Sequence, residues 1–144
     1  VGRTTPFETR GDVALLGTFG YELDITKLSA EEKEQVKEQV EKYHKYNDLI
    51  REGDYYRLAS VADNGYYDSW MIDDKTKDRA LLFYVQVRAR ANAKSRFIRL
   101  AGLDPERRYT VEGREYTGNT LMQAGVRVPA EFGDFKSRLI EITG

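Results

Sequence analysis

Residues 81–89 read Leu-Leu-Phe-Tyr-Val-Gln-Val-Arg-Ala, and they carry the clearest strand pattern in the chain. Successive side chains of an extended chain point to opposite faces. One face of this stretch therefore holds Phe83, Val85, Val87 and Ala89, and the other holds Tyr84, Gln86 and Arg88. The stretch predicts a strand, and the pattern around it decides which kind of sheet the strand joins.

Shorter strand patterns surround this stretch on both sides. They cover residues 55–59, 66–72, 97–100, 109–112, 115–117, 126–128 and 135–142. Asn64-Gly65 is a strong hairpin-turn signal, because both residue types tolerate positive φ, and Glu112-Gly113 is another turn signal. Many short strands separated by turns are typical of an antiparallel sandwich or barrel. Residues 118–125 fit either a strand or a single helical turn.

Residues 29–51 predict a helix. Ser29 and Glu32 have the spacing of a capping box, and Lys45 and Arg51 near the end suit the helix dipole. A mostly apolar stripe recurs at helical spacing and consists of Val36, Val40, Tyr43, Asn47 and Ile50. Gly53 suits the left-handed position after the last turn.

An apolar run, residues 13–20, precedes this helix. It is continuous rather than alternating, which is typical of a strand buried on both faces, and we expect a strand at Val13–Thr18. A strand followed by a helix resembles one unit of an α/β barrel, and one unit cannot bury itself. We expect the run and the helix stripe to pack onto the β domain, pair with a second copy or stay mobile. An unpaired apolar strand predicts dimers or aggregates.

Composition narrows the class of protein. The chain has 144 residues and a net charge of −1, so its length fits one domain or one domain plus a fragment, and its charge does not suggest a nucleic-acid binder. It has no cysteine, which excludes disulfides and thiolate metal sites. No apolar run reaches the roughly 20 residues of a membrane span. The chain opens on Val1 rather than on methionine, so we expect it to come from within a longer protein.

Few residues point to metal or nucleophilic chemistry. The single histidine, His44, lies in the middle of the predicted helix, and we expect a solvated or partly buried histidine rather than a metal ligand. Residues 73–78 resemble a calcium loop superficially but lack the central glycine and the final glutamate, so they predict a charged hairpin connection. No serine-hydrolase or phosphate-loop motif is present.

Three side-chain groups keep two interpretations each. Asp12, Glu22 and Asp24 flank the apolar run and fit either a glycosidic acid/base pair or loop carboxylates and helix caps, and we favour the second. A basic stretch fits either a phosphate-contacting surface or a solvated strand end with the loop after it. It consists of Arg88, Arg90, Lys94, Arg96 and Arg99. Six aromatic residues fit either a platform that stacks on sugars or the filling of the core. They are Tyr55, Tyr56, Tyr66, Tyr67, Trp70 and Tyr84.

A series of short motifs, in this order, resembles the C-terminal end of the bacterial α-galactosidases of glycoside hydrolase family 36. The motifs are Val1-Gly2-Arg3-Thr4-Thr5-Pro6, Arg10-Gly11-Asp12-Val13, residues 17–24, Leu28-Ser29, residues 53–58, Trp70-Met71, Gly102-Leu103-Asp104-Pro105, Gly118 with Leu121-Met122 and Gly125, Gly133-Asp134-Phe135 and Ser137-Arg138-Leu139. The resemblance implies an N-terminal β-sandwich, a central (β/α)8 catalytic barrel and a C-terminal antiparallel β domain. Residues 1–53 would be the remnant of the barrel, with its last strand and helix, and residues 54–144 the C-terminal antiparallel β-sandwich.

The resemblance also implies a function. The family hydrolyses terminal α-D-galactosyl residues of melibiose- and raffinose-type sugars with retention, using two aspartates that match no position in this chain. No catalytic residue is therefore expected here, and the turn Gly17, Thr18, Phe19 and Gly20 is expected near the sugar site. The chain alone is expected to lack activity and to serve as a structural or accessory domain.

Two alternatives remain. One is a stand-alone carbohydrate-binding β-sandwich module, and the other is a complete small enzyme that uses Asp12, Glu22 or Asp24. We expect no cofactor and no metal, an α-galactoside bound by the missing barrel, and a homo-oligomeric, cytoplasmic bacterial parent protein without nucleic-acid or membrane partners.

Overall fold

The computed structural model describes residues 4–144. Val1, Gly2 and Arg3, which begin the first resembling motif, lie outside the described residues. The helices are α1 (Phe7–Ala14), the 3-10 turn η1 (Ile25–Lys27), α2 (Ala30–Glu52), α3 (Val61–Asn64) and α4 (Gly118–Gln123). The strands are β1 (Asp54–Ala59), β2 (Tyr67–Asp73), β3 (Arg79–Gln86), β4 (Arg96–Ile98), β5 (Arg108–Val111), β6 (Arg114–Thr117), β7 (Val126–Val128) and β8 (Lys136–Thr143).

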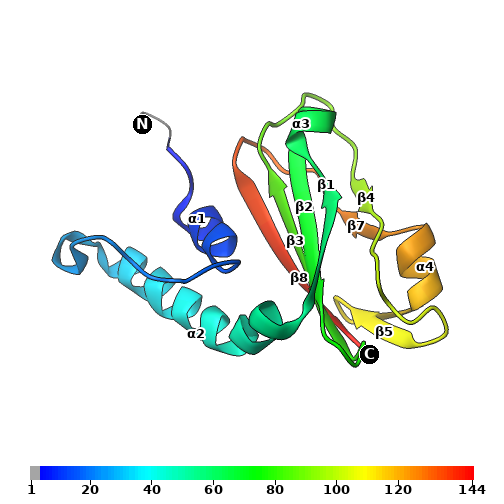
Figure 1. Ribbon diagram of the computed structural model, residues 1–144. Helices are drawn as coiled ribbons and strands as arrows, with labels where there is room; N and C mark the ends of the chain where they lie inside the picture. Colours follow the sequence, from blue (N-terminus) through cyan, green and yellow to red (C-terminus); the bar gives the residue numbers. More distant parts are fainter. Residues whose placement is uncertain (1–3) are drawn as a thin grey trace.

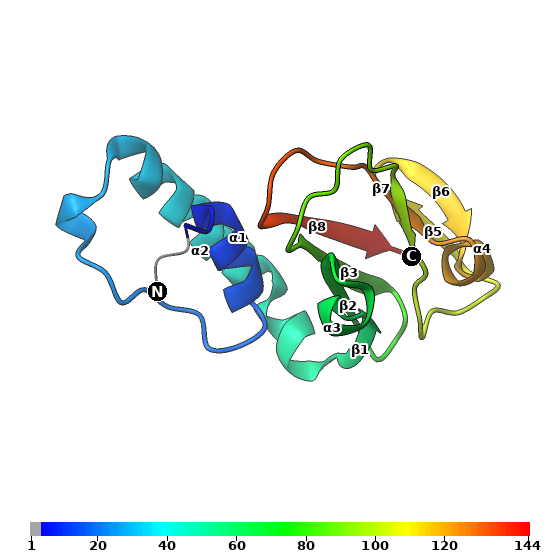
Figure 2. The same ribbon diagram turned by 90° about the horizontal axis from the view of Figure 1, so that it is seen from above.

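The predicted antiparallel β architecture is confirmed. A six-stranded sheet has the order β1-β2-β3-β8-β5-β6, and β4 pairs with β7 in a second, two-stranded sheet. The longest stretch of pairing joins β3 to β8, from Arg79 opposite Thr143 to Gln86 opposite Lys136. The small sheet and α4 lie on one side of the large sheet, and α1 and α2 lie on the other (Figures 1 and 2).

Strand β3 is buried on both faces, and this explains its continuous apolar sequence. Ala80, Leu82 and Tyr84 point into a core under the small sheet, together with Ile98, Leu121, Val128 and Ile142 among others. Leu81, Phe83 and Val85 point into a second core under the helices, together with Leu15, Tyr46, Leu49, Trp70 and Ile72. Phe83 and Val85 share a face as predicted, but the strand ends at Gln86, so Ala89 lies beyond it and is exposed.

Helix α2 begins and ends close to the predicted positions, and its capping box between Ser29 and Glu32 is confirmed. The buried face differs from the predicted stripe. Its buried residues are Gln39, Tyr46 and Leu49, whereas Val36 and Val40 are only half-buried. Helix α1 packs beside α2, and the face of α2 that it covers includes Gln39. A search for apolar residues at helical spacing does not detect this polar side chain. No helix within residues 4–144 is long and apolar enough to span a membrane.

The strand predicted at Val13–Thr18 is wrong: these residues form the end of α1 and the turn after it. Pro6 immediately precedes the helix and Glu8 lies in its first turn, both favourable at a helix start. Leu15, at the C-terminal end of the helix, is 2% exposed and reaches the core under the helices. Packing onto the β domain, one of the three expected outcomes, is thus seen for Leu15, whereas Val13 is 43% exposed.

Two turn predictions have different outcomes. Residues 64–65 do lie between β1 and β2, but they end the short helix α3 rather than form a two-residue hairpin turn. Gly65 is left-handed there, with a φ of 80°, and the Asn64 side chain accepts hydrogen bonds from the amides of Tyr66 and Tyr67. Glu112 and Gly113 both have positive φ and form the two-residue turn between β5 and β6, as predicted. The ambiguous segment 118–125 contains the helix α4.

The left-handed conformation predicted for Gly53 is wrong. Its backbone is extended, with a φ of −76° and a ψ of 172°. The absence of a side chain matters for a different reason, because a Cβ atom there would lie 2.5 Å from Cγ2 of Ile72 and 2.6 Å from the carbonyl oxygen of Leu49. Gly53 is thus required for the close approach of the end of α2 to the C-terminal end of β2.

We predict that Gly53→Ala lowers the free energy of unfolding by about 1–3 kcal/mol, because the added methyl group must displace packed backbone. Urea unfolding followed by Trp70 fluorescence measures this. Gly17→Ala is the matched control, because no atom lies within 4 Å of the corresponding Cβ position. Equal unfolding midpoints for the two variants would contradict the assignment.

Candidate functional site

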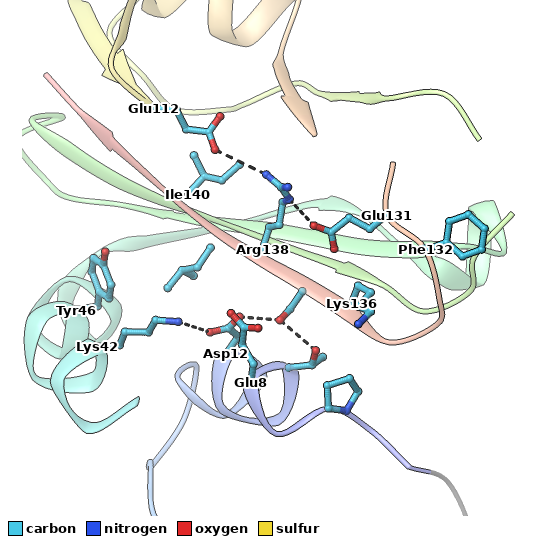
Figure 3. A pocket seen from close by; sticks show the side chains of 14 residues that line it. Glu8, Asp12, Lys42, Tyr46, Glu112, Glu131, Phe132, Lys136, Arg138 and Ile140 are labelled. Atoms are coloured by element: carbon cyan, nitrogen blue, oxygen red, sulfur yellow. Dashed lines mark hydrogen bonds and ion pairs between the residues drawn. The ribbon is translucent and has the colours of Figure 1, made fainter. Parts of the chain in front are cut away.

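A cleft of about 630 Å³ lies between the helices and β8, an inner strand of the large sheet (Figure 3). We call it the helix–sheet cleft. Its lining residues come from α1 and the residue before it, α2, β8, the loop before β8 and the turn between β5 and β6. They are Pro6, Glu8, Thr9, Asp12, Lys42, Tyr46, Glu112, Glu131, Phe132, Lys136, Ser137, Arg138, Leu139 and Ile140. Charges of both signs line this cleft, so its chemistry depends on how they are paired.

Asp12 is the most deeply buried charged group of the cleft, at 4% exposure. Ser137 on β8 donates a hydrogen bond of 2.7 Å to its Oδ2, and Lys42 Nζ on α2 lies 3.5 Å from its Oδ1. Thr9, one turn earlier on α1, donates to the carbonyl oxygen of Phe135 at 2.7 Å. Figure 3 shows these groups converging from three elements. Asp12 therefore joins α1 to both α2 and the sheet.

A second polar junction joins α1 to α2 away from the sheet. Gln39 of α2 donates to the carbonyl oxygen of Phe7 at 2.9 Å and accepts from the Tyr21 hydroxyl at 2.7 Å. A Cβ atom on Gly11 would lie 2.4 Å from Cδ of Gln39, so the glycine permits this crossing. One buried amide thus holds the helix pair together with the loop that follows α1.

Glu141 on β8 forms an ionic cluster near Tyr46. Lys45 donates a hydrogen bond of 2.6 Å to Oε2, and Arg79 donates one of 2.9 Å to Oε1. The cations of Lys45 and Arg79 also lie over the Tyr46 ring, at 4.9 and 5.1 Å from its centroid. Burial alone would raise the pKa of Glu141, but the hydrogen bonds from Lys45 and Arg79 outweigh it and lower the pKa. This cluster is a second fastening between α2 and the sheet.

The turn expected near the sugar site, Gly17–Gly20, follows α1 directly. Phe19 stacks on Tyr43 of α2, with ring centroids 5.3 Å apart, and a Cβ atom at Gly17 or Gly20 would meet nothing. Phe19 and Gly20 line a second hollow of about 280 Å³, together with Tyr21 and Glu22 among others. The turn is thus anchored by one ring while its glycines remain open on one side.

The structure separates the three candidate carboxylates. Asp12 lines the helix–sheet cleft, whereas Glu22 lines the second hollow. Asp24 caps η1, accepting hydrogen bonds from the hydroxyl and the amide of Thr26, and these bonds lower its pKa. The cap interpretation is confirmed for Asp24, and Asp12 and Glu22 line different hollows.

The other candidates are placed in ordinary structural roles. His44 is exposed on α2 beside the Tyr43 ring. Residues 74–78 connect β2 to β3, and Asp74 accepts a hydrogen bond from the amide of Asp78, so the charged hairpin connection is confirmed. Within residues 4–144 no group of three or more histidine, cysteine or carboxylate side chains is arranged to hold a metal ion.

The six aromatic residues are divided between the two faces of the sheet. Trp70 stacks on Phe83 in the core under the helices, with centroids 5.3 Å apart. Tyr56, Tyr67 and Tyr84 pack in or against the opposite core. Tyr55, by contrast, is 50% exposed on the edge strand β1. Most of these rings fill the core, and they do not form one continuous platform.

Sequence reasoning missed the residues that fasten the helices to the sheet. Thr9 and Lys42 belong to no motif, the motif containing Ser137 gives no sign of its contact with Asp12, and the apolar pattern does not include Gln39. The helical spacing of Gln39, Tyr43, Tyr46 and Ile50 does indicate the buried face of α2. These residues form a second stripe, in which one amide side chain accompanies two aromatic rings and an isoleucine. Ser137 and Thr9, 128 positions apart, offered no local signal.

This arrangement fastens the helices to the sheet. Asp12 pairs with Ser137 of β8 and Lys42 of α2, and Thr9 of α1 bonds to the carbonyl oxygen of Phe135, so these contacts join three elements. The fold and this cleft therefore define a β domain fastened to a helical segment. Two family profiles match the same two parts: "Melibiase" matches residues 1–53, and "Glycosyl hydrolase family 36 C-terminal domain" matches residues 67–142.

The chain belongs to glycosyl hydrolase family 36. It is 45% identical over 130 residues to the bifunctional alpha-galactosidase/sucrose kinase AgaSK of Mediterraneibacter gnavus, covering 89% of this chain and 14% of that protein. It is 44% identical over 140 residues to alpha-galactosidase Mel36A of Lactobacillus acidophilus, covering 96% and 19%. The chain thus spans less than a fifth of the length of these curated relatives.

The fold agrees closely with a solved structure of the family. A variant of alpha-galactosidase AgaA from Geobacillus stearothermophilus, in complex with raffinose, superposes with a TM-score of 0.94 at 42% identity. The superposition covers 99% of this chain and 20% of that protein. Because nearly the whole chain superposes, the position of α1 and α2 against the sheet also matches the arrangement in the larger protein.

We predict that Asp12→Ala loosens α1 from the sheet and lowers the free energy of unfolding by about 2 kcal/mol, since it removes a charge-assisted hydrogen bond. Hydrogen exchange of the α1 amides and urea unfolding measure the two effects. Asp48→Ala is the control, because the Asp48 side chain is 87% exposed in its pair with Arg51. Unchanged α1 exchange would show that Asp12 does not hold this contact.

We further predict a pH-dependent contribution from Glu141. A carboxyl group whose pKa is lower in the folded state stabilises the fold above its unfolded pKa, and this stabilisation is lost as pH falls through the folded pKa. Glu141→Gln should therefore lower stability by about 1 kcal/mol near neutral pH, with the difference vanishing in acid. Denaturant unfolding between about pH 7 and about pH 2 tests this. Glu115→Gln, whose parent side chain is 67% exposed, should show no such difference.

Proposed function

We propose that this chain is the C-terminal part of a retaining α-galactosidase that hydrolyses terminal α-D-galactosyl residues of melibiose- and raffinose-type sugars. The match of the family profiles to both parts of the chain carries the proposal. Named α-galactosidases at 44–45% identity support the activity, and a family structure in complex with raffinose supports the class of substrate. Retention in glycosidases generally needs two carboxyl groups about 5–5.5 Å apart.

We propose that the chain itself supplies no catalytic carboxylate and acts as an accessory domain. Asp12, Glu22 and Asp24 occupy separate places, and Asp12 is already engaged by Ser137 and Lys42. The accessory role is to hold residues 4–53, as the end of the barrel, against a rigid β domain of residues 54–144. The turn Gly17–Gly20 would then lie beside the sugar site. The homo-oligomeric state and cytoplasmic location of the parent protein stay predictions.

The proposal predicts no turnover by the 144-residue chain on a chromogenic α-galactoside, and turnover by the longer parent protein at equal concentration. The physical reason is that a barrel enzyme builds its pocket from the loops of several strands, most of which this chain lacks. A triple variant that changes Asp12, Glu22 and Asp24 to the corresponding amides is the control for background hydrolysis. Turnover by the chain that disappears in this variant would overturn the accessory role.

A stand-alone sugar-binding module is the alternative function. The exposed ring of Tyr55 is the observation that favours it, because aromatic faces stack on sugars. Amide chemical shifts of β1 during a raffinose titration decide between the two. Shifts that Tyr55→Ala abolishes would support the binding module, whereas unchanged spectra would support the purely structural role.

A further inference from the structure

The loop between β3 and β4 forms a second polar surface, which shares no lining residue with the helix–sheet cleft. It encloses a hollow of about 580 Å³ lined by residues 90–97 and by Tyr67 of β2. Three cations line it, namely Arg90, Lys94 and Arg96, and no carboxylate does. We call this the basic hollow. Neither the family profiles nor the proposed function assigns it a role.

Local sequence concentrates positive charge there. Between Arg79 and Leu103 the sequence contains no aspartate or glutamate, although the chain as a whole carries 24 acidic residues against 23 basic ones. Fourteen ion pairs join cations to carboxylates in the described part of the chain, and none involves Arg90, Lys94 or Arg96. The hollow therefore keeps a positive potential that its own carboxylates do not neutralise.

Aromatic side chains hold the guanidinium groups in place. The Arg96 guanidinium lies 4.4 Å from the Tyr67 ring centroid, and its Nε donates a hydrogen bond of 3.1 Å to the Tyr84 hydroxyl. Arg90 and Arg96 also approach the ring of Tyr66, at 5.6 and 5.8 Å. Cation–π contacts of this kind orient an arginine without consuming its charge. The ordering of two long side chains, normally an entropic cost of binding, is thus partly met before any ligand arrives.

We propose that the basic hollow binds a phosphate-type dianion, either free phosphate or the phosphate group of a phosphorylated sugar. Arginine guanidinium groups bind such oxyanions through paired N–H donors, and a lysine adds a mobile point charge. Phe97 lines the same hollow and is 61% exposed, so its ring offers an apolar face to the sugar of a phosphorylated ligand. The site lies apart from the helix–sheet cleft, and it stands or falls independently of the proposed α-galactosidase function.

Titration of the 144-residue chain tests the proposal by following the amide chemical shifts of residues 90–97. The three probes are inorganic phosphate, glucose 6-phosphate and glucose, each at constant ionic strength maintained with chloride. Phosphate and glucose 6-phosphate are expected to shift these amides saturably, and glucose is not. Equal affinity for the two anions would identify phosphate alone as the ligand, and tighter binding of glucose 6-phosphate would add the sugar. Absence of saturable shifts with both anions would overturn the proposal.

Variants identify the residues responsible. The double variant Arg90→Gln with Lys94→Gln changes two exposed side chains and should weaken phosphate binding about tenfold or more, since charge-assisted hydrogen bonds are lost. Arg51→Gln is the matched control, because it removes an exposed arginine from α2, which does not line the hollow, and should leave affinity unchanged. Equal weakening in both variants would show that net charge alone attracts the anion, and this result would overturn the assigned site.

Discussion

The whole structure depends on a central sheet whose middle strands need cover on both faces. Strand β3 alternates between two cores, with Leu82 on one side and Phe83 on the other, and neither side chain is more than 1% exposed. The small sheet β4–β7 and α4 cover one face of the large sheet. The other face is covered by α1 and α2. Removing the helical segment would therefore expose Phe83, Trp70 and their neighbours, so the two parts form one folding unit in physical terms.

Apolar packing alone does not fix the orientation of α1 and α2 on the sheet, and polar contacts fix it here. Hydrophobic burial depends on area, so a helix pair could rotate on a flat apolar face at small cost. Asp12 with Ser137, and Glu141 with Lys45, join the helices to β8 at two separate points. Two such fastenings restrict that rotation. A buried carboxylate left without its partners is costly, so the correct register of α1 is favoured over neighbouring ones.

Much of the fold was predictable because it depends on local signals. The capping box at Ser29, the alternation within β3 and the turn at Glu112-Gly113 are each encoded within a few residues. Residues 13–18 were assigned wrongly because a short apolar run fits a buried strand and the buried end of a helix equally well. Gly53 was misjudged because its role depends on Ile72, which comes close only in the folded chain. The fastenings of the cleft escaped prediction for the same reason.

The helix–sheet cleft and the basic hollow differ in how far their charged side chains are paired. In the helix–sheet cleft, Asp12 is matched by Lys42 and Ser137, and Arg138 is matched by Glu131, so its polar groups act mainly on one another. An interior built in this way transmits position: movement of β8 must move α1, and with it the start of the turn at Gly17. With the turn Gly17–Gly20 beside the sugar site, as proposed above, the β domain would influence that site without contributing a side chain to it. The three cations of the basic hollow, by contrast, lack an ion-pair partner among the described residues, and Tyr67 places this hollow on the side of the sheet away from the helices.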